Sequence, residues 1–172
     1  MIKFKNGSNS EARKNICEST LFNTTKKAYG KMYHEHFLEQ YKAAIQGVDY
    51  TSKWKHTINS YYLAINTVLL AAVGLSLSRE KLVLPETAHD LILIIGMFIA
   101  IVWWVNLRTY NNVLAAKFSI LHCIEEHLPL SLYKTEWTLL KTIYGRPRRA
   151  LVDGLVPVLF LVFYILIFFF VK

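Results

Sequence analysis

The sequence predicts an all-α integral membrane protein with three transmembrane helices, the first two of which extend beyond the membrane as cytoplasmic helical stalks. Three apolar segments support this fold class, at residues 60–77, 91–107 and 155–171. Each is close to the ~17–25 residues that a bilayer core requires, and none contains Asp, Glu, Lys or Arg. The hydrophobic content of 53% also exceeds the ~45–50% of soluble domains, which disfavours a soluble bundle with buried core helices.

Lysine and arginine are distributed unevenly between the segments that flank these spans. Residues 1–58 carry ten, residues 78–90 carry two and residues 108–150 carry seven. The positive-inside rule then places the N-terminus and the 108–150 segment in the cytoplasm, and the C-terminus outside. Cys17 and Cys123 would both lie on the reducing side, so we expect no disulfide between them. The beginning of the chain lacks the apolar region of a signal peptide, and we expect none.

Residues 1–32 are polar and basic, with weak hydrophobic periodicity. We expect a poorly ordered cytoplasmic tail there, and a single membrane domain over residues 33–172. One interpretation of the tail is a solvated segment that helps to fix topology. The other is a surface that binds a polyanion, because clustered lysines attract phosphate groups, and its candidate residues are Lys26, Lys27 and Lys31.

The first span is expected to continue a helix that begins well before the membrane. Residues 33–58 carry an apolar stripe at spacings near three and four, and no proline interrupts residues 33–77. The span is the most polar of the three, with Asn66 and Thr67 at its centre and Gly74 further along. Amides and small residues in hydrocarbon usually face another helix or a wet cavity, so these are candidate residues for a pore or a helix interface.

The second span carries two further features. Gly96 and Ala100 are four residues apart, which is the small-xxx-small spacing for close helix contact and extends the set of candidate interface residues. At the end of the span, aromatic rings and a cation mark the membrane–cytoplasm boundary, where amphipathic side chains prefer to lie. We interpret this boundary as a joint between span and stalk, formed by Trp103, Trp104, Arg108 and Tyr110.

Residues 108–144 are expected to form cytoplasmic helices with a break at Pro129, because proline disfavours helical backbone in the residue before it. The turn that follows carries Arg146, Arg148 and Arg149. These arginines suit either topology anchoring at anionic lipid headgroups or phosphate binding to a ligand. The third span has bulky side chains all round, which is typical of a lipid-facing helix.

The chain lacks the motifs of catalysis. No GxSxG or other nucleophile–base arrangement is present, and no glycine-rich phosphate loop. The histidines at His34 and His36, and those near Cys123, do not provide the four ligands of a closed zinc site. We therefore expect no enzyme, no cofactor and no metal.

The stretch WWVNLRTYNNVLAAKFSILHCIEEHLPLSLYKTEW, which ends at Trp137, resembles the RipA-type family of small oligomeric bacterial membrane proteins. The resemblance covers residues 59–137, about half of the chain. It implies a bacterial inner-membrane location and a homo-oligomer, but no reaction. Beyond the joint, the positions that match the family's pattern include Lys117, Phe118, Glu125, Pro129, Glu136 and Trp137.

These observations favour a homo-oligomeric pore or channel-like effector, framed by the first two spans and gated from the cytoplasm by a polyanionic oligonucleotide or nucleotide. A looser similarity, in size and plan only, is to the small helical membrane effectors of antiphage systems. The alternative is a non-conducting scaffold or stress and intracellular-fitness factor that recruits a cytoplasmic protein partner. A third hypothesis is a membrane subunit that assists an enzyme encoded elsewhere.

Overall fold

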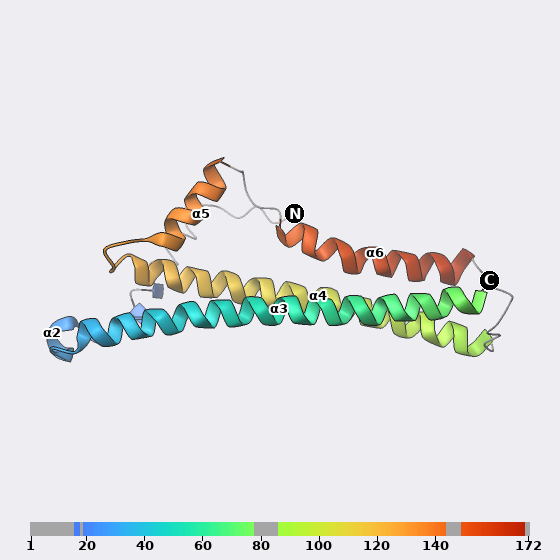
Figure 1. Ribbon diagram of the computed structural model, residues 1–172, viewed down its shortest axis with the longest axis horizontal. Coiled ribbons are helices and arrows are strands. Elements are labelled where there is room, and N and C mark those ends of the chain that lie inside the picture. Colours follow the sequence, from blue (N-terminus) through green and yellow to red (C-terminus); the bar gives the residue numbers. More distant parts are fainter. Residues whose placement is uncertain (1–15, 18, 78–85, 144–148, 171–172) are drawn as a thin grey trace. The chain divides into compact units, whose positions relative to one another are not determined.

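A computed structural model describes residues 16–17, 19–77, 86–143 and 149–170 (Figure 1). These residues form helices and turns but no strand, which confirms the predicted all-α fold class. Three of the helices are long and apolar enough to cross a membrane. The helices are α2 (Lys26–Tyr29), α3 (Tyr33–Leu77), α4 (Glu86–Glu125), α5 (Leu132–Ile143) and α6 (Arg149–Phe170).

Helices α3 and α4 are much longer than a bilayer is thick. Helix α3 has 45 residues and α4 has 40, which correspond to lengths of about 68 Å and 60 Å at 1.5 Å per residue. Only about 30 Å of each can lie in hydrocarbon, so both helices must continue outside it, as the sequence predicts. No proline interrupts either helix, and α4 ends at Glu125, shortly before Pro129.

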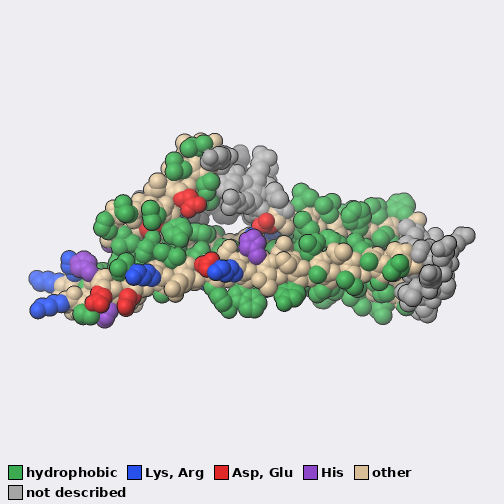
Figure 2. Space-filling view, in the orientation of Figure 1, with side chains coloured by type: hydrophobic (Ala, Val, Ile, Leu, Met, Phe, Trp, Pro, Cys, Tyr) green, Lys and Arg blue, Asp and Glu red, His purple; other side chains and the backbone are tan. Residues whose placement is uncertain are grey.

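The chain divides into two compact units, and both long helices pass from one to the other. The stalk unit comprises residues 1–51 and 113–146, and the membrane unit comprises residues 52–112 and 147–172. All three predicted spans belong to the membrane unit. Figure 2 shows hydrophobic side chains along most of α6, whereas most of the charged side chains in this view lie over α2 and the first half of α3, with acidic ones over α5.

The core of the membrane unit joins α3, α4 and α6 through Val73, Leu93 and Tyr164, one from each helix. Helix α6 is therefore not uniformly lipid-facing, because the Tyr164 side chain is fully buried. The remaining bulky residues of α6, such as Phe163 and Phe169, are exposed as the sequence predicts for a lipid-facing helix.

The stalk unit contains a disulfide between Cys17 and Cys123. The expectation that these cysteines stay unpaired was wrong. It rested on compartment alone, whereas the fold brings the segment before α2 back to the end of α4, with a Cα–Cα distance of 6.2 Å that a disulfide can bridge. The described part of the basic tail, including α2, therefore lies against the stalk helices.

Candidate functional site

The exposed side of α3 in the membrane unit carries a line of small and hydroxyl-bearing residues. They recur at spacings of three and four and so share one helix face. Every one of them is solvent-exposed in the single chain, and Gly74 has no atom within 4 Å of where a Cβ would lie. We call this surface the small-residue face; it comprises Thr57, Ser60, Ala64, Thr67, Ala71 and Gly74.

The span portion of α4 and helix α6 expose bulky apolar side chains, and α3 itself exposes Tyr61, Val68 and Leu75 beside the small-residue face. Helix α4 exposes Leu91, Ile94, Phe98 and Ile101, and the exposed residues of α6 are leucine, valine, isoleucine and phenylalanine. Such side chains match lipid tails. Small residues leave a lipid-facing helix poorly covered and are enriched where helices approach closely. The small-residue face is thus the surface of this unit that best suits a neighbouring helix or water.

Asn66 and Thr67 are adjacent in sequence but have different environments. Asn66 is fully buried, with its amide nitrogen donating to the Tyr62 carbonyl at 2.8 Å and its Oδ1 accepting from the Tyr164 hydroxyl at 3.2 Å. Thr67 is exposed, and its hydroxyl donates to the Leu63 carbonyl at 2.8 Å. Of these two candidates, Asn66 therefore packs helices within one chain, while Thr67 belongs to the small-residue face.

The small-xxx-small pair of α4 also serves packing within the chain. A Cβ at Gly96 would overlap the Tyr164 ring, so only glycine admits that ring between the helices. Ala100, one turn further, is buried as well. The partner of Gly96 is helix α6, which the sequence had suggested would be purely lipid-facing.

Polar side chains cross-link the helices at the level of the predicted joint. Trp103 is buried, donates its indole N–H to Asn59 Oδ1 at 3.0 Å, and stacks on Tyr62 with ring centroids 5.9 Å apart. Asn106 Nδ2 donates to the Tyr62 hydroxyl at 2.7 Å. Sequence reasoning missed the roles of Asn59, Tyr62 and Asn106. The sequence does carry a signal for these roles, since each of the three is a polar residue near the end of an apolar segment.

Trp104, Arg108 and Tyr110 lie differently from Trp103. The Trp104 ring is exposed, with the Arg108 guanidinium 5.6 Å from its centroid, a cation–π arrangement. A Cβ at Gly154 of α6 would lie 3.5 Å from the Trp104 indole nitrogen, so α6 passes close to this ring. Tyr110 is half-buried, and among the described residues no hydrogen bond of its side chain is found.

An ion pair between Lys55 of α3 and Asp153 of α6 lies in the same unit. The side chains are 15% and 34% exposed, so both charges are partly withdrawn from water, and their pairing offsets that cost. This pair could not be predicted from the sequence, because its members are 98 residues apart.

In the stalk unit, Glu125 connects three helices. Its carboxylate is buried and accepts from the Tyr41 hydroxyl at 3.1 Å and from the backbone N–H groups of Tyr133 and Lys134, both at 2.9 Å. It therefore caps the start of α5, where unpaired N–H groups favour an anion. Burial, together with the hydrogen bond to Glu125, raises the pKa of Tyr41 to about 12.

Lys117 ties the two stalk helices together. Its ammonium donates to the backbone carbonyl of Gly47 at 2.7 Å, and the Thr51 hydroxyl donates to the same carbonyl at 2.8 Å. Of the other positions in the family pattern, Phe118 packs its ring against Tyr133, with centroids 6.0 Å apart. Pro129, Glu136 and Trp137 are exposed.

Of the basic candidate residues, the structure describes the side chains of only three. Lys26, Lys27 and Lys31 are exposed on α2 and the turn after it. Arg146 and Arg148 lie outside the described residues, and for Arg149 only the helical backbone is described. Within the described ranges, no group of three or more His, Cys, Asp or Glu side chains could hold a metal ion.

Comparison with protein-family models gives a match over most of the chain. The model of the octameric membrane protein family (8xMP) matches residues 38–171, which include most of the stalk unit and nearly all of the membrane unit. No curated protein and no solved structure matches. The match extends beyond the range of the RipA-type resemblance at both ends, and its description does not mention RipA. Because the match covers most of the chain, this protein belongs to the octameric membrane protein family, a family of oligomeric membrane proteins.

Proposed function

We propose that the protein forms a homo-octameric pore in a bacterial inner membrane, with the small-residue face of α3 around the central path. The observation that carries this proposal is the exposure of small and hydroxyl-bearing residues on one side of α3, beside bulky apolar surfaces on α4 and α6. In a ring of eight chains, the bulky surfaces meet lipid and neighbouring chains. The small-residue face then supplies close helix contacts and a polar lining.

The stalk unit is the proposed gate. It is joined to the membrane unit through two unbroken helices, so a rearrangement of the stalk reaches the spans without crossing a flexible loop. The orientation in this proposal has the stalk in the cytoplasm and the C-terminus outside, from the distribution of lysine and arginine. In that reducing compartment the Cys17–Cys123 disulfide would form only under oxidising conditions. A polyanionic ligand, such as a nucleotide or oligonucleotide, is the proposed signal, and antiphage defence is the proposed setting on similarity of plan alone. The protein acts without catalysis in this scheme.

The test is ion flux through liposomes that contain the purified oligomer. Thr67→Phe adds a bulky ring to the small-residue face and is expected to reduce flux strongly. Val162→Phe, a matched control on the exposed side of α6, is expected to leave flux unchanged. Intact octamers that conduct no ion with or without a nucleotide or oligonucleotide would contradict the proposal, as would equal flux for both variants.

A scaffold function is the second candidate, because α5 presents an apolar surface. Leu132, Leu139 and Ile143 recur at helical spacing on this short helix and are exposed. Such a face suits a cytoplasmic protein partner. Leu139→Glu is expected to release that partner without changing flux, and loss of flux would instead assign α5 to the pore assembly.

A further inference from the structure

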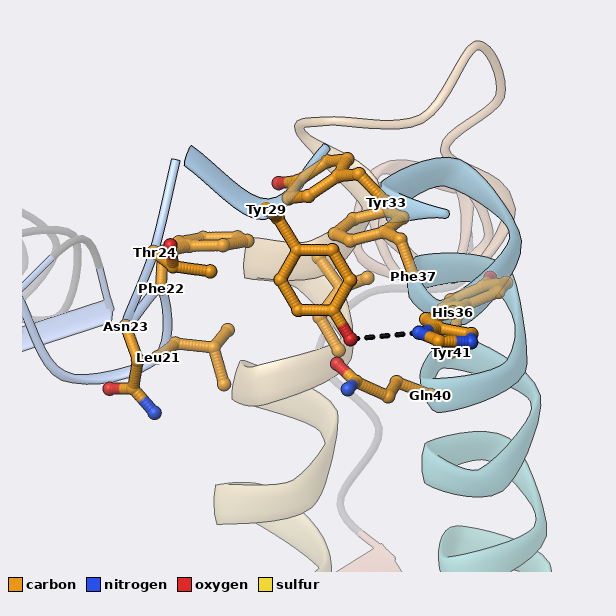
Figure 3. Close-up of a pocket in the computed structure, with 11 residues that line it drawn as sticks. Leu21, Phe22, Asn23, Thr24, Tyr29, Tyr33, His36, Phe37, Gln40 and Tyr41 are labelled. Atoms are coloured by element: carbon orange, nitrogen blue, oxygen red, sulfur yellow. Dashed lines mark hydrogen bonds between the residues drawn. The ribbon is translucent and has the colours of Figure 1, made fainter. Parts of the chain in front are cut away.

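The stalk unit contains a cavity between the N-terminal segment, the first turns of α3 and the end of α4 (Figure 3). Its volume is about 220 Å³. This is below the ~300–1,000 Å³ of sites for drug-sized ligands, so it has room for a single ring system rather than for a whole large cofactor. The cavity belongs entirely to the stalk unit and is separate from the small-residue face.

Aromatic rings form much of the wall. Phe22 and Phe37 lie nearly parallel, with an interplanar angle of 18° and centroids 6.4 Å apart. Tyr33 stacks on Phe37 at 5.8 Å, and Tyr29 stands edge-on to Tyr33. Aromatic side chains on several sides of a small cavity favour a planar aromatic guest, because stacking contributes about 1–3 kcal/mol per nucleic acid base in proteins that bind single strands.

The wall also carries hydrogen-bonding groups that are free to meet a guest. Figure 3 shows Gln40 extending from α3 so that its amide lies beside the Tyr29 hydroxyl, which is itself bonded to His36 Nδ1 at 2.8 Å. Asn23 and Thr24 line the opposite side. Within the described part of the chain, no hydrogen bond involves the side-chain amides of Asn23 or Gln40. An amide pairs well with the mixed donor and acceptor edge of a nucleobase.

The segment that forms this wall is basic and is covalently held. Lys26, Lys27 and Lys31 follow the cavity-lining residues closely and are exposed, and no ion pair of theirs is found among the described residues. The disulfide from Cys17 to Cys123 fixes the segment to α4, and the Phe22 ring packs on His127 with centroids 4.3 Å apart. The wall is thus largely preorganised, which lowers the entropic cost of binding.

We propose that this cavity binds the base of a nucleotide, with its phosphate outside the cavity over Lys26, Lys27 and Lys31. The base comes either from a free nucleotide or from an unpaired position of a single-stranded oligonucleotide. This inference rests on the ligand-gating part of the proposed function, for which it supplies the site and the ligand class. It does not depend on whether the membrane unit conducts.

Equilibrium dialysis of the full-length protein in detergent tests the inference, with adenosine monophosphate, uridine monophosphate, adenosine, inorganic phosphate and a short oligothymidylate as probes. Gln40→Leu is expected to weaken binding of a nucleotide or of the oligonucleotide about tenfold or more. Gln46→Leu is the matched control, because Gln46 is exposed on the same helix and does not line the cavity. Adenosine is expected to bind more weakly than its monophosphate, because it lacks the group that meets the lysines.

The outcomes separate cleanly. Tight binding of the oligonucleotide without binding of monophosphates assigns the strand as the source of the base. Inorganic phosphate that binds as tightly as the nucleotides, or equal affinities for Gln40→Leu and Gln46→Leu, would overturn the inference. If Gln40→Leu changes oligomer size, Asn23→Leu replaces it as the test variant. An absence of nucleotide binding in protein that still conducts ions would overturn the proposed nucleotide site but would not contradict the proposed pore.

Discussion

The hydroxyl of Tyr164 on α6 donates to Asn66 on α3, within 3.2 Å of both its side-chain and its backbone oxygen, in the buried centre of the membrane unit. Both side chains are buried and shielded from lipid, so each provides the other with a hydrogen-bonding partner that hydrocarbon could not provide. The third span is thereby attached to the first by a polar contact as well as by apolar packing.

Removal of that hydroxyl should destabilise the membrane unit. In Tyr164→Phe the Asn66 side-chain oxygen loses its partner in an apolar environment, at a cost of about 1–2 kcal/mol. Thermal denaturation of the detergent-solubilised oligomer measures the loss as a lower Tm. Tyr61→Phe, at an exposed tyrosine of α3, is the control and should leave Tm unchanged. Equal Tm values for both variants would show that the contact contributes nothing.

The two glycines of the spans should respond differently to the same substitution. Gly96→Ala forces the Tyr164 ring to move, at a cost of about 1–3 kcal/mol, and should lower the Tm of the protein. Gly74→Ala meets no atom of its own chain and should leave the protomer folded while weakening assembly. Size-exclusion chromatography and Tm together distinguish the two effects. Recovery of stability in Gly96→Ala with Tyr164→Leu would identify the ring as the cause.

Arg108 should contribute more to the coupling between the stalk unit and the membrane unit than to the stability of the fold. Its guanidinium lies over the exposed Trp104 ring, beside the close approach of α6 at Gly154. Arg108→Ala is expected to alter the ligand dependence of flux or the oligomer size, with a small change in Tm because the contact is exposed. Normal flux, ligand response and assembly would reduce Arg108 to an anchor at the membrane surface.

The stalk unit should lose stability as the solution becomes acidic. Burial lowers the pKa of His122 below its usual value near 6.5, against the opposing effect of the Glu125 carboxylate and with further influence from Tyr133, Lys134 and Glu126. Below pH 6.5 the unfolded chain binds a proton that the folded chain resists, so the free energy of unfolding falls as pH falls through that value. Hydrogen exchange of the end of α4 between pH 7.5 and 5.5 measures this fall. His122→Leu should abolish the part that this ring contributes, and an unchanged pH profile would contradict the assignment.

Reduction of the disulfide should release the segment that precedes α3. Transfer of two electrons from a dithiol reductant opens the Cys17–Cys123 bond, and the N-terminal segment then depends on ring contacts such as that of Phe22 with His127. Trypsin cleavage after Lys26 and Lys27 is expected to accelerate severalfold in the reduced protein. Cys17→Ser protein should be cleaved at the fast rate with or without reductant. Equal protection of oxidised and reduced wild-type protein would show that the disulfide does not hold the segment.

The long elements could be predicted from sequence because they depend on local pattern. The unbroken helix over residues 33–77 follows from periodicity without proline, and the break near Pro129 follows from proline sterics. The contacts that assemble the units could not be predicted in this way. Asn66 and Tyr164 are 98 residues apart and Cys17 and Cys123 are 106 apart, so neither pairing leaves a local signal.

The different environments of adjacent residues also could not be predicted from the sequence. Asn66 and Thr67 look alike as polar residues in an apolar span, and only the direction of each around the helix separates the buried one from the exposed one. Similarly, Trp103 and Trp104 read as one interfacial pair, yet one is a core residue and the other lies at the surface. Burial thus depends on which helices approach, which the periodicity of one helix does not specify.

The Gly47 carbonyl accepts both the Lys117 ammonium and the Thr51 hydroxyl, close to the end of the stalk unit. A displacement of one stalk helix is therefore transmitted to the other through the hydrogen bond of the Lys117 ammonium before it reaches the spans. In a ring of eight such chains, the two stalk helices of each chain would move together. The long and flexible side chain of lysine allows this helix pair to twist while the hydrogen bond to Gly47 is kept.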